Sequence, residues 1–241
     1  MTKTVENLLR NSGLPGPRGN LRLMYSFAHQ ATRDEINECL AFYNDKLANS
    51  PEEFVVMCGI VGYCVLNQSH LQDTLTVIRG YASHQSWRIR EAVAMGIQEI
   101  ASANMEAILD NLENWLTGDE LEKRAVVAAL CEPKLLLGEK AVNLRIVNIL
   151  AKLALEFAEI DGKLSENQNA LRKALGYGWS VVIVAIPDEG KAAFEGMAGN
   201  SNKHIQWIVK ENLKKHRLQV MDKKWVEKMM AVCAEKGDIS I

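Results

Sequence analysis

Apolar residues recur along most of this chain at intervals of three or four positions, with polar residues between them. The longest example runs from Val142 to Phe157, and a shorter one runs from Ile89 to Ile100. This spacing matches the 3.6-residue turn of an amphipathic helix, whereas a half-buried strand alternates at every second position. We count about a dozen such segments, most of them roughly 10 to 20 residues long. The pattern therefore predicts an all-α protein.

One segment fits two interpretations. Trp179 to Ile186 is a run of apolar residues rich in β-branched side chains, and it lies between Gly178 and Pro187. Such a run suits a buried strand as well as a buried helix. The sequence offers no partner strand nearby, so we favour a buried helix here.

Start and stop signals separate the helical segments. A Ser, Thr or Asp followed three positions later by Glu or Gln can form a capping box, in which each side chain accepts a hydrogen bond from the other residue's backbone N–H. We predict capping boxes at four such pairs, which begin at Thr32, Ser50, Asp119 and Ser165. The stop signals are Glu132–Pro133, Gly138, Gly162 and Pro187. Residues 13–19 hold two prolines and three glycines, and predict a loop.

Three segments resemble one another and indicate an internal repeat. Each places a large apolar residue three positions before a cation and continues with an apolar helical face: residues 87–94, 121–128 and 207–214. The aligned cations Arg90, Arg124 and Lys210 are separated by 34 and 86 residues, and the second distance is about two periods of 43. Helix pairs of this length cannot bury their apolar faces alone, so they stack into a superhelix with a concave inner surface.

Two of these segments, Trp87–Ala94 (WRIREAVA) and Asn114–Leu130 (NWLTGDELEKRAVVAAL), resemble consecutive HEAT-like repeats of the DNA alkylation repair superfamily, the AlkD-like alkylpurine glycosylases. His204–Lys215 is similar in character. The resemblance implies a right-handed α-α superhelix of HEAT/armadillo-like repeats. We expect a single helical-repeat domain over residues 1–241, made of an irregular N-terminal cap (1–50), HEAT-like repeats (51–217) and a C-terminal helix (218–241).

The resemblance does not extend to a catalytic residue. The family's catalytic pair follows a Trp-x-x-x-Asp spacing on the helix of an earlier repeat, and Trp115–Asp119 has that spacing. Here, however, Gly118 and Asp119 are typical of a helix stop followed by a new N-cap. The corresponding earlier helix, residues 53–63, contains no aspartate. We therefore assign no catalytic residue and expect Asp119 to be a helix cap; for an enzyme, the resemblance would imply a DNA glycosylase.

Composition and charge exclude some classes of protein. The 241 residues are 48% hydrophobic, which excludes intrinsic disorder, and 28 Lys and Arg face 30 Asp and Glu, which excludes a globally basic nucleic-acid binder. The charge is uneven. Residues 1–202 carry 19 cations and 25 anions, a net charge of −6, whereas residues 203–241 carry nine and five, a net charge of +4. A local basic surface is therefore still expected.

The repeat cations are the first candidates for binding. In a nucleic-acid reader Arg88, Arg90 and Arg124 would contact backbone phosphates, and Trp87 could stack against a nucleotide. In the structural alternative each arginine pairs with a glutamate of a neighbouring helix, and Trp87 fills the seam between repeats.

The basic C-terminal cluster is the second candidate. It combines Trp207 with Lys210, Lys214 and Lys215, and continues through Arg217, Lys223, Lys224 and Trp225. Its functional interpretation is a phosphate-facing patch or a docking site for an acidic partner. Its structural interpretation is that the cations complement the C-terminal dipole of their helix.

The sequence contains no motif that indicates a metal site or a cofactor site. No CxxC, HxxH or HExxH motif, no P-loop and no dinucleotide fingerprint occurs, so we predict no metal site and no small-molecule cofactor. The five cysteines suit free core thiols in a reducing compartment. We expect Arg18 and its loop to have a structural role.

No apolar run approaches the roughly 20 residues of a membrane span, and the polar N-terminus does not resemble a signal peptide, so we expect a cytoplasmic protein.

Two functional hypotheses follow. The leading one is a non-enzymatic binding or scaffold protein whose concave face holds a macromolecular partner, in the first instance a protein. The alternative is a nucleic-acid-binding relative of the alkylation repair glycosylases, with or without residual catalysis.

Overall fold

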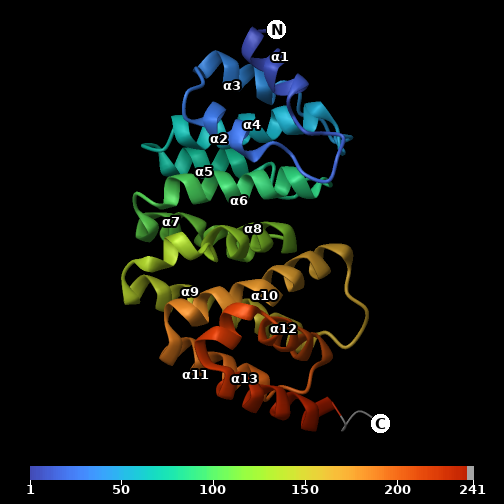
Figure 1. Ribbon diagram of the computed structural model, residues 1–241, viewed down its shortest axis with the longest axis vertical. Coiled ribbons are helices and arrows are strands. Elements are labelled where there is room, and N and C mark those ends of the chain that lie inside the picture. The colour runs from blue at the N-terminus through green and yellow to red at the C-terminus, as the bar shows by residue number, and fades with distance from the viewer. Residues whose placement is uncertain (238–241) are drawn as a thin grey trace. The chain divides into compact units, whose positions relative to one another are not determined.

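The computed structural model describes residues 1–237 of the chain (Figure 1). Over this range it contains thirteen α-helices and three short 3-10 helices, and no strand. The prediction of an all-α protein is confirmed. The residues contact one another in two compact units, Met1–Ala129 and Leu130–Ile241, which we call unit 1 and unit 2.

Unit 1 is built from short N-terminal helices followed by longer ones. Its elements are α1 (Lys3–Arg10), α2 (Leu21–Ala28), α3 (Arg33–Leu40), α4 (Pro51–Leu66), α5 (Leu71–Arg79), α6 (Trp87–Ala101), α7 (Met105–Leu112), the 3-10 helix η1 (Glu113–Thr117) and α8 (Glu120–Leu130). The last residue of α8 already belongs to unit 2.

Helices α4 and α6 form the core of unit 1. Most of α4 is buried because α1, α2 and α3 pack against it and α6 runs beside it. Glu53 meets Arg88 near the N-terminal ends of α4 and α6, and Gly96 faces Cys64 in their second halves. The two helices therefore run in the same direction. A Cβ at Gly96 would lie 2.6 Å from the Cys64 sulfur, so this close approach requires glycine.

Three of the four predicted capping boxes form. The reciprocal bonds are present at Thr32, which caps α3, and at Ser165, which caps the later helix α10. The Asp119 carboxylate accepts from two backbone N–H groups of the first turn of α8, while its own N–H donates to Glu122. Asp119 is therefore a helix cap, as predicted.

The prediction of a capping box at Ser50 is confirmed only for one of its two hydrogen bonds. The Ser50 hydroxyl accepts from the Glu53 N–H, and Pro51 occupies the first turn of α4, as predicted. The Glu53 carboxylate instead accepts hydrogen bonds from the Asn49 N–H and the Ser86 hydroxyl. Another helix competes for this carboxylate, which no local spacing rule can anticipate.

Unit 2 also consists of helices. Its elements are the 3-10 helix η2 (Pro133–Leu137), α9 (Lys140–Leu155), the 3-10 helix η3 (Glu156–Glu159), α10 (Glu166–Ala185), α11 (Pro187–Ala198), α12 (Lys203–Leu213) and α13 (His216–Gly237).

Helix α10 contacts all the other α-helices that lie wholly in unit 2, namely α9, α11, α12 and α13 (Figure 1). It includes the ambiguous segment 179–186 up to Ala185, and Ile186 separates it from α11. Trp179 is buried in an aromatic cluster with Phe194 and Trp225. The helical interpretation of this segment is confirmed, because neighbouring helices bury the β-branched run and no strand of the described chain lies beside it.

The two ends of the chain differ in detail from the expectation. The predicted cap, residues 1–50, contains three eight-residue helices joined by loops, including the predicted loop at 13–19. The C-terminal helix begins at His216 and is interrupted at Asp222, whose φ of −158° and ψ of 87° are not helical. Residues 238–241 of the predicted helix lie outside the described residues.

Four further expectations concern the superhelix, the single domain, the cysteines and membrane-spanning segments. The right-handed superhelix and the single domain over residues 1–241 stay predictions, because the two units are each defined only by their own internal contacts. The five cysteines are free and buried, as expected of core thiols. In the part of the chain that the structure describes, no helix is both long enough and apolar enough to cross a membrane.

Candidate functional site

Arg88 and Trp87 begin α6 and have opposite environments. The Arg88 guanidinium is buried, lies 3.5 Å from the Glu53 carboxylate and donates to the Gly16 carbonyl at 2.7 Å. Trp87 remains 54% exposed, and the Arg88 guanidinium lies 4.7 Å from the centre of its ring. Arg88 therefore fastens the glycine- and proline-rich loop to α4 and α6, as in the structural alternative. Trp87 does not fill a seam, so this part of the alternative is wrong.

Arg90 and Arg124 lie on the neighbouring helices α6 and α8. Arg90 donates to the carbonyl groups of His84 and Gln85 at 2.6 and 2.7 Å. Arg124 donates to the Arg90 carbonyl at 3.1 Å and to the Glu91 carboxylate at 2.5 Å. Burial lowers the pKa of Arg90, and the nearby charge of Arg124 lowers it further. Both side chains are thus engaged in holding loops and helices of unit 1 together.

In unit 2 the predicted lysines surround Glu211 on α12. Lys214 forms an ion pair with the Glu211 carboxylate, and Lys215 lies 3.9 Å from its other oxygen. The hydrogen bond from Lys214 holds the pKa of Glu211 below its ordinary value, although burial opposes this effect. Lys210 lies towards α13, where its charge opposes the rise that burial causes in the pKa of Cys233.

Trp207 lies between two residues of α10. The Arg172 guanidinium is 4.3 Å from the centre of the indole ring, and a Cβ on Gly176 would lie 2.9 Å from a ring carbon. Arg172 is fixed in turn by Asn169, at 3.0 Å, and by Nδ1 of His204, at 3.1 Å. A guanidinium can only donate, so this His204 nitrogen accepts.

Tyr177 follows Gly176 and points to the start of α13. It is 43% exposed, and its hydroxyl accepts a 2.8 Å hydrogen bond from Arg217. The Arg217 guanidinium also lies 4.7 Å from the centre of the Tyr177 ring. Two arginine–aromatic pairs, Arg172–Trp207 and Arg217–Tyr177, therefore lie on either side of Gly176.

These contacts join into one surface that crosses α10, α12 and the start of α13, and we call it the α10–α12 surface. It consists of the contacting residues Arg172, Tyr177, Trp207, Glu211, Lys214, Lys215 and Arg217, together with exposed Lys173, which lies one turn before Tyr177 on α10. Five cations accompany one carboxylate, although the whole chain has a net charge of −2. The surface includes four residues of the predicted basic cluster, Trp207, Lys214, Lys215 and Arg217, whereas Lys210 of that cluster lies towards Cys233 of α13.

Sequence reasoning did not include Arg172, Lys173 and Tyr177. They lie 30 or more residues before Trp207 in the sequence, and only the packing of α12 on α10 brings them beside it. The adjacent cations at 172 and 173, followed by Gly176–Gly178, were the available signal. Trp225 belongs to the core instead: it is buried and its indole N–H donates to Glu195 at 2.7 Å.

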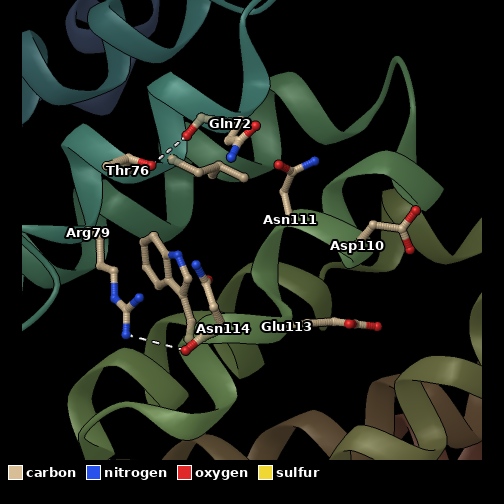
Figure 2. Close-up of a pocket in the computed structure, with 9 residues that line it drawn as sticks. Gln72, Thr76, Arg79, Asp110, Asn111, Glu113 and Asn114 are labelled. Atoms are coloured by element: carbon tan, nitrogen blue, oxygen red, sulfur yellow. Dashed lines mark hydrogen bonds between the residues drawn. The ribbon is translucent and has the colours of Figure 1, made fainter.

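Unit 1 contains a polar pocket of about 380 Å³ between α5 and α7 (Figure 2). Its wall consists of Gln72, Leu75, Thr76, Arg79, Asp110, Asn111, Glu113, Asn114 and Trp115. Arg79 donates to both oxygens of Glu122, at 2.6 and 2.8 Å, and to the Asn114 carbonyl at 3.3 Å. Figure 2 shows Glu113 pointing away from Thr76.

The lining of this pocket is poor in groups for covalent catalysis. It contains no serine, cysteine, histidine or lysine. Its one hydroxyl, that of Thr76, donates to the Gln72 carbonyl at 2.8 Å. A hydroxyl nucleophile needs a base that takes its proton, and here the proton is directed at a backbone carbonyl. The pocket therefore does not present an activated hydroxyl or thiol.

No group of three or more His, Cys, Asp and Glu among the described residues has a geometry that could hold a metal ion. Burial raises the pKa of the Cys39 thiol to about 12 and that of the Cys131 thiol to about 12, so neither is a ready nucleophile at neutral pH.

Comparison with known proteins gives no relative for this chain: no protein-family model, no curated protein and no solved structure matches it.

Proposed function

We propose that this chain is a non-enzymatic binding or scaffold protein, built from HEAT-like repeats in a right-handed superhelix, that holds a macromolecular partner. The observation that carries the proposal is the α10–α12 surface. Arginine and aromatic side chains are enriched at the energetic centres of protein interfaces, and here two such pairs occur together on one face of unit 2.

The contacts between α6 and α8 support the repeat architecture. Arg90 and Arg124, the aligned cations of the first two repeats, are 34 residues apart and are joined by a hydrogen bond. Further along the same two helices, Gln98 donates to the Ala128 carbonyl at 2.9 Å. Equivalent positions of successive repeats are expected to touch in this way when helix pairs stack.

The α10–α12 surface is rigid enough for specific binding. Trp207 is held between Arg172 and Gly176, and Arg172 is held by two further side chains. Side chains that are fixed before binding lose less conformational entropy when the partner arrives. The surface therefore combines charge, apolar area and order.

Affinity capture with the full chain tests this proposal. We expect a macromolecular component that binds the wild type to be lost from the double variant Lys173→Glu/Lys214→Glu, in which two exposed lysines of the surface are reversed. The matched control is Lys134→Glu/Lys163→Glu, which reverses two exposed lysines elsewhere in unit 2 and should keep the component. A set of captured components that is the same for both double variants would contradict the proposal.

Duplex nucleic-acid binding is the second candidate, and exposed Trp87 beside Arg88 favours it. An anisotropy titration with labelled duplex DNA tests it: we expect salt-dependent binding that weakens when Trp87→Ala removes the indole. Lack of salt-dependent binding below about 10⁻⁵ M would contradict this candidate.

Residual catalysis is tested separately, by measuring the release of alkylated purines from DNA. Because Asp119 caps α8, Asp119→Asn should leave any such release unchanged.

A further inference from the structure

The α10–α12 surface has an exposed apolar centre. Tyr177 is 43% exposed, and Val220, which is 71% exposed, lies one helical turn after Arg217 on α13. Arg217 contacts Tyr177, and its i, i+3 spacing from Val220 places these two residues on the same side of α13. Exposed apolar side chains next to an arginine are a suitable anchor for apolar residues of a partner.

Cations surround this apolar centre. Lys173 lies one turn before Tyr177 on α10 and is exposed, while Lys214 and Lys215 directly follow α12 and precede Arg217 by three and two residues. Glu211 is the one carboxylate of the surface, and it already pairs with Lys214 and Lys215. A partner that supplies several carboxylates would match the excess positive charge.

The aromatic rings do not form a stacking platform for nucleotide bases. Trp207 has the Arg172 guanidinium over its ring and the α10 backbone at Gly176 against its edge. Tyr177 has the Arg217 guanidinium against its ring. Single-stranded nucleic acids are bound through open aromatic faces on which successive bases stack. Trp207 is covered in this way and Tyr177 is the only well-exposed ring of the surface, so successive bases have no row of open rings to stack on, and the observations favour a protein segment over a nucleic acid.

We propose that the α10–α12 surface docks an acidic, amphipathic segment of a partner protein. The apolar residues of the segment pack on Tyr177 and Val220, and its carboxylates pair with Lys173, Lys214, Lys215 and Arg217. This inference rests on the proposed binding function and names the kind of partner that the surface takes.

Fluorescence anisotropy with the full-length chain and a labelled probe tests the inference. The probe is an 18-residue synthetic peptide with Leu and Phe at helical spacing between Asp and Glu. A second peptide carries Ser in place of Leu and Phe, and an 18-nucleotide oligothymidylate represents single-stranded nucleic acid. We expect the amphipathic peptide to bind with a micromolar dissociation constant that rises with NaCl concentration, because the contacts include surface charges.

Variants connect this binding to the surface. Lys173→Glu/Lys214→Glu should weaken binding of the amphipathic peptide at least about tenfold, because like charges then face each other. Tyr177→Ala should weaken it about threefold or more by removing apolar contact area. The control Lys134→Glu/Lys163→Glu has the same net charge as the first double variant and should bind like the wild type. Thermal unfolding of each variant verifies that the fold is retained.

Several results would overturn the inference. They are absence of binding by the amphipathic peptide, equal loss in the control double variant, equal binding of the serine peptide, and tighter binding of the oligothymidylate. The last result would leave the proposed binding function intact and change only the class of partner. The proposed function itself fails only if affinity capture finds no component that depends on the surface.

Discussion

At the scale of single residues, Arg88 donates to the Gly16 carbonyl and lies against the Glu53 carboxylate, with only 9% of its side chain exposed. Glu53 is still more buried, at 1% exposure, and also accepts from the Asn49 N–H and the Ser86 hydroxyl. A carboxylate that is removed from water in this way needs its partners, because no solvent can replace them. Glu53 and Arg88 together therefore tie three segments of unit 1 to one another: the loop at Gly16, the start of α4 and the start of α6.

Replacing Arg88 by methionine should lower the free energy of unfolding by about 3 to 5 kcal/mol, since the Glu53 charge stays buried without its cation. Adding Glu53→Gln should recover part of this loss by removing the charge. Arg18→Met is the matched control, because Arg18 is exposed in the neighbouring loop, and should change stability by less than about 0.5 kcal/mol. Urea unfolding measures all three variants, and a loss below about 1 kcal/mol for Arg88→Met would contradict a stabilising role.

Sequence reasoning identified Arg88 and offered pairing with a glutamate as one of its two roles. It did not identify Glu53 as the partner, because this residue is 35 positions earlier and was assigned to a local capping box. Local spacing rules predict hydrogen bonds within a turn of helix. They carry no information about which distant helix lies close enough to compete for the same carboxylate.

At the scale of elements, the contact between α10 and α12 depends on Gly176. Its missing side chain lets the Trp207 ring and the Cβ of Glu211 approach the α10 backbone, where a Cβ would lie 2.9 and 3.3 Å from them. Behind this contact, Asn212 of α12 accepts from the Ser180 N–H and donates to the Leu175 carbonyl, at 2.8 and 2.9 Å. The two helices therefore meet along backbone as well as side chains.

Gly176→Ala and Gly196→Ala should have opposite effects on stability. The new methyl group at 176 collides with Trp207, and the collision should lower the free energy of unfolding by about 1 to 3 kcal/mol and displace Arg172. Gly196 lies inside α11, where a Cβ would have no atom within 4 Å, so alanine there should stabilise by about 0.5 to 1 kcal/mol through helix propensity. Urea unfolding and tryptophan fluorescence measure both effects. Equal stabilisation by the two changes would mean that the packing of α12 on α10 does not require glycine at position 176.

The helices themselves could be predicted from the sequence, because periodicity and capping act over a few residues. Thr32, Asp119 and Ser165 each begin a helix where expected. The interruption at Asp222 was missed: its carboxylate accepts from the Trp225 N–H and pairs with Lys191 of α11, so a tertiary contact accompanies the break. The α10–α12 surface was predicted only for its residues between Trp207 and Arg217, because the residues of α10 join it through the packing of α12 on α10.

At the scale of the whole molecule, charge is divided between the two units. Unit 1 carries eleven Lys and Arg against sixteen Asp and Glu, a net charge of −5, whereas unit 2 carries seventeen against fourteen, a net charge of +3. The sequence had located the positive charge in residues 203–241 alone. Arg172 and Lys173 of α10 extend the positive region within unit 2, and a partner of opposite charge would therefore approach unit 2 first.

The two units should also differ in how they respond to local damage. Each buries its own core, around α4 and α6 in unit 1 and around α10 in unit 2. A variant that weakens one core should therefore increase local opening mainly in its own unit. Amide hydrogen exchange followed by mass spectrometry tests this: Arg88→Met should speed exchange in α4 and α6 and spare α10 and α12, and Gly176→Ala should do the reverse. Equal acceleration in both units by either variant would instead indicate one cooperative domain over residues 1–241, as the repeat architecture predicts when coupling between neighbouring repeats is strong.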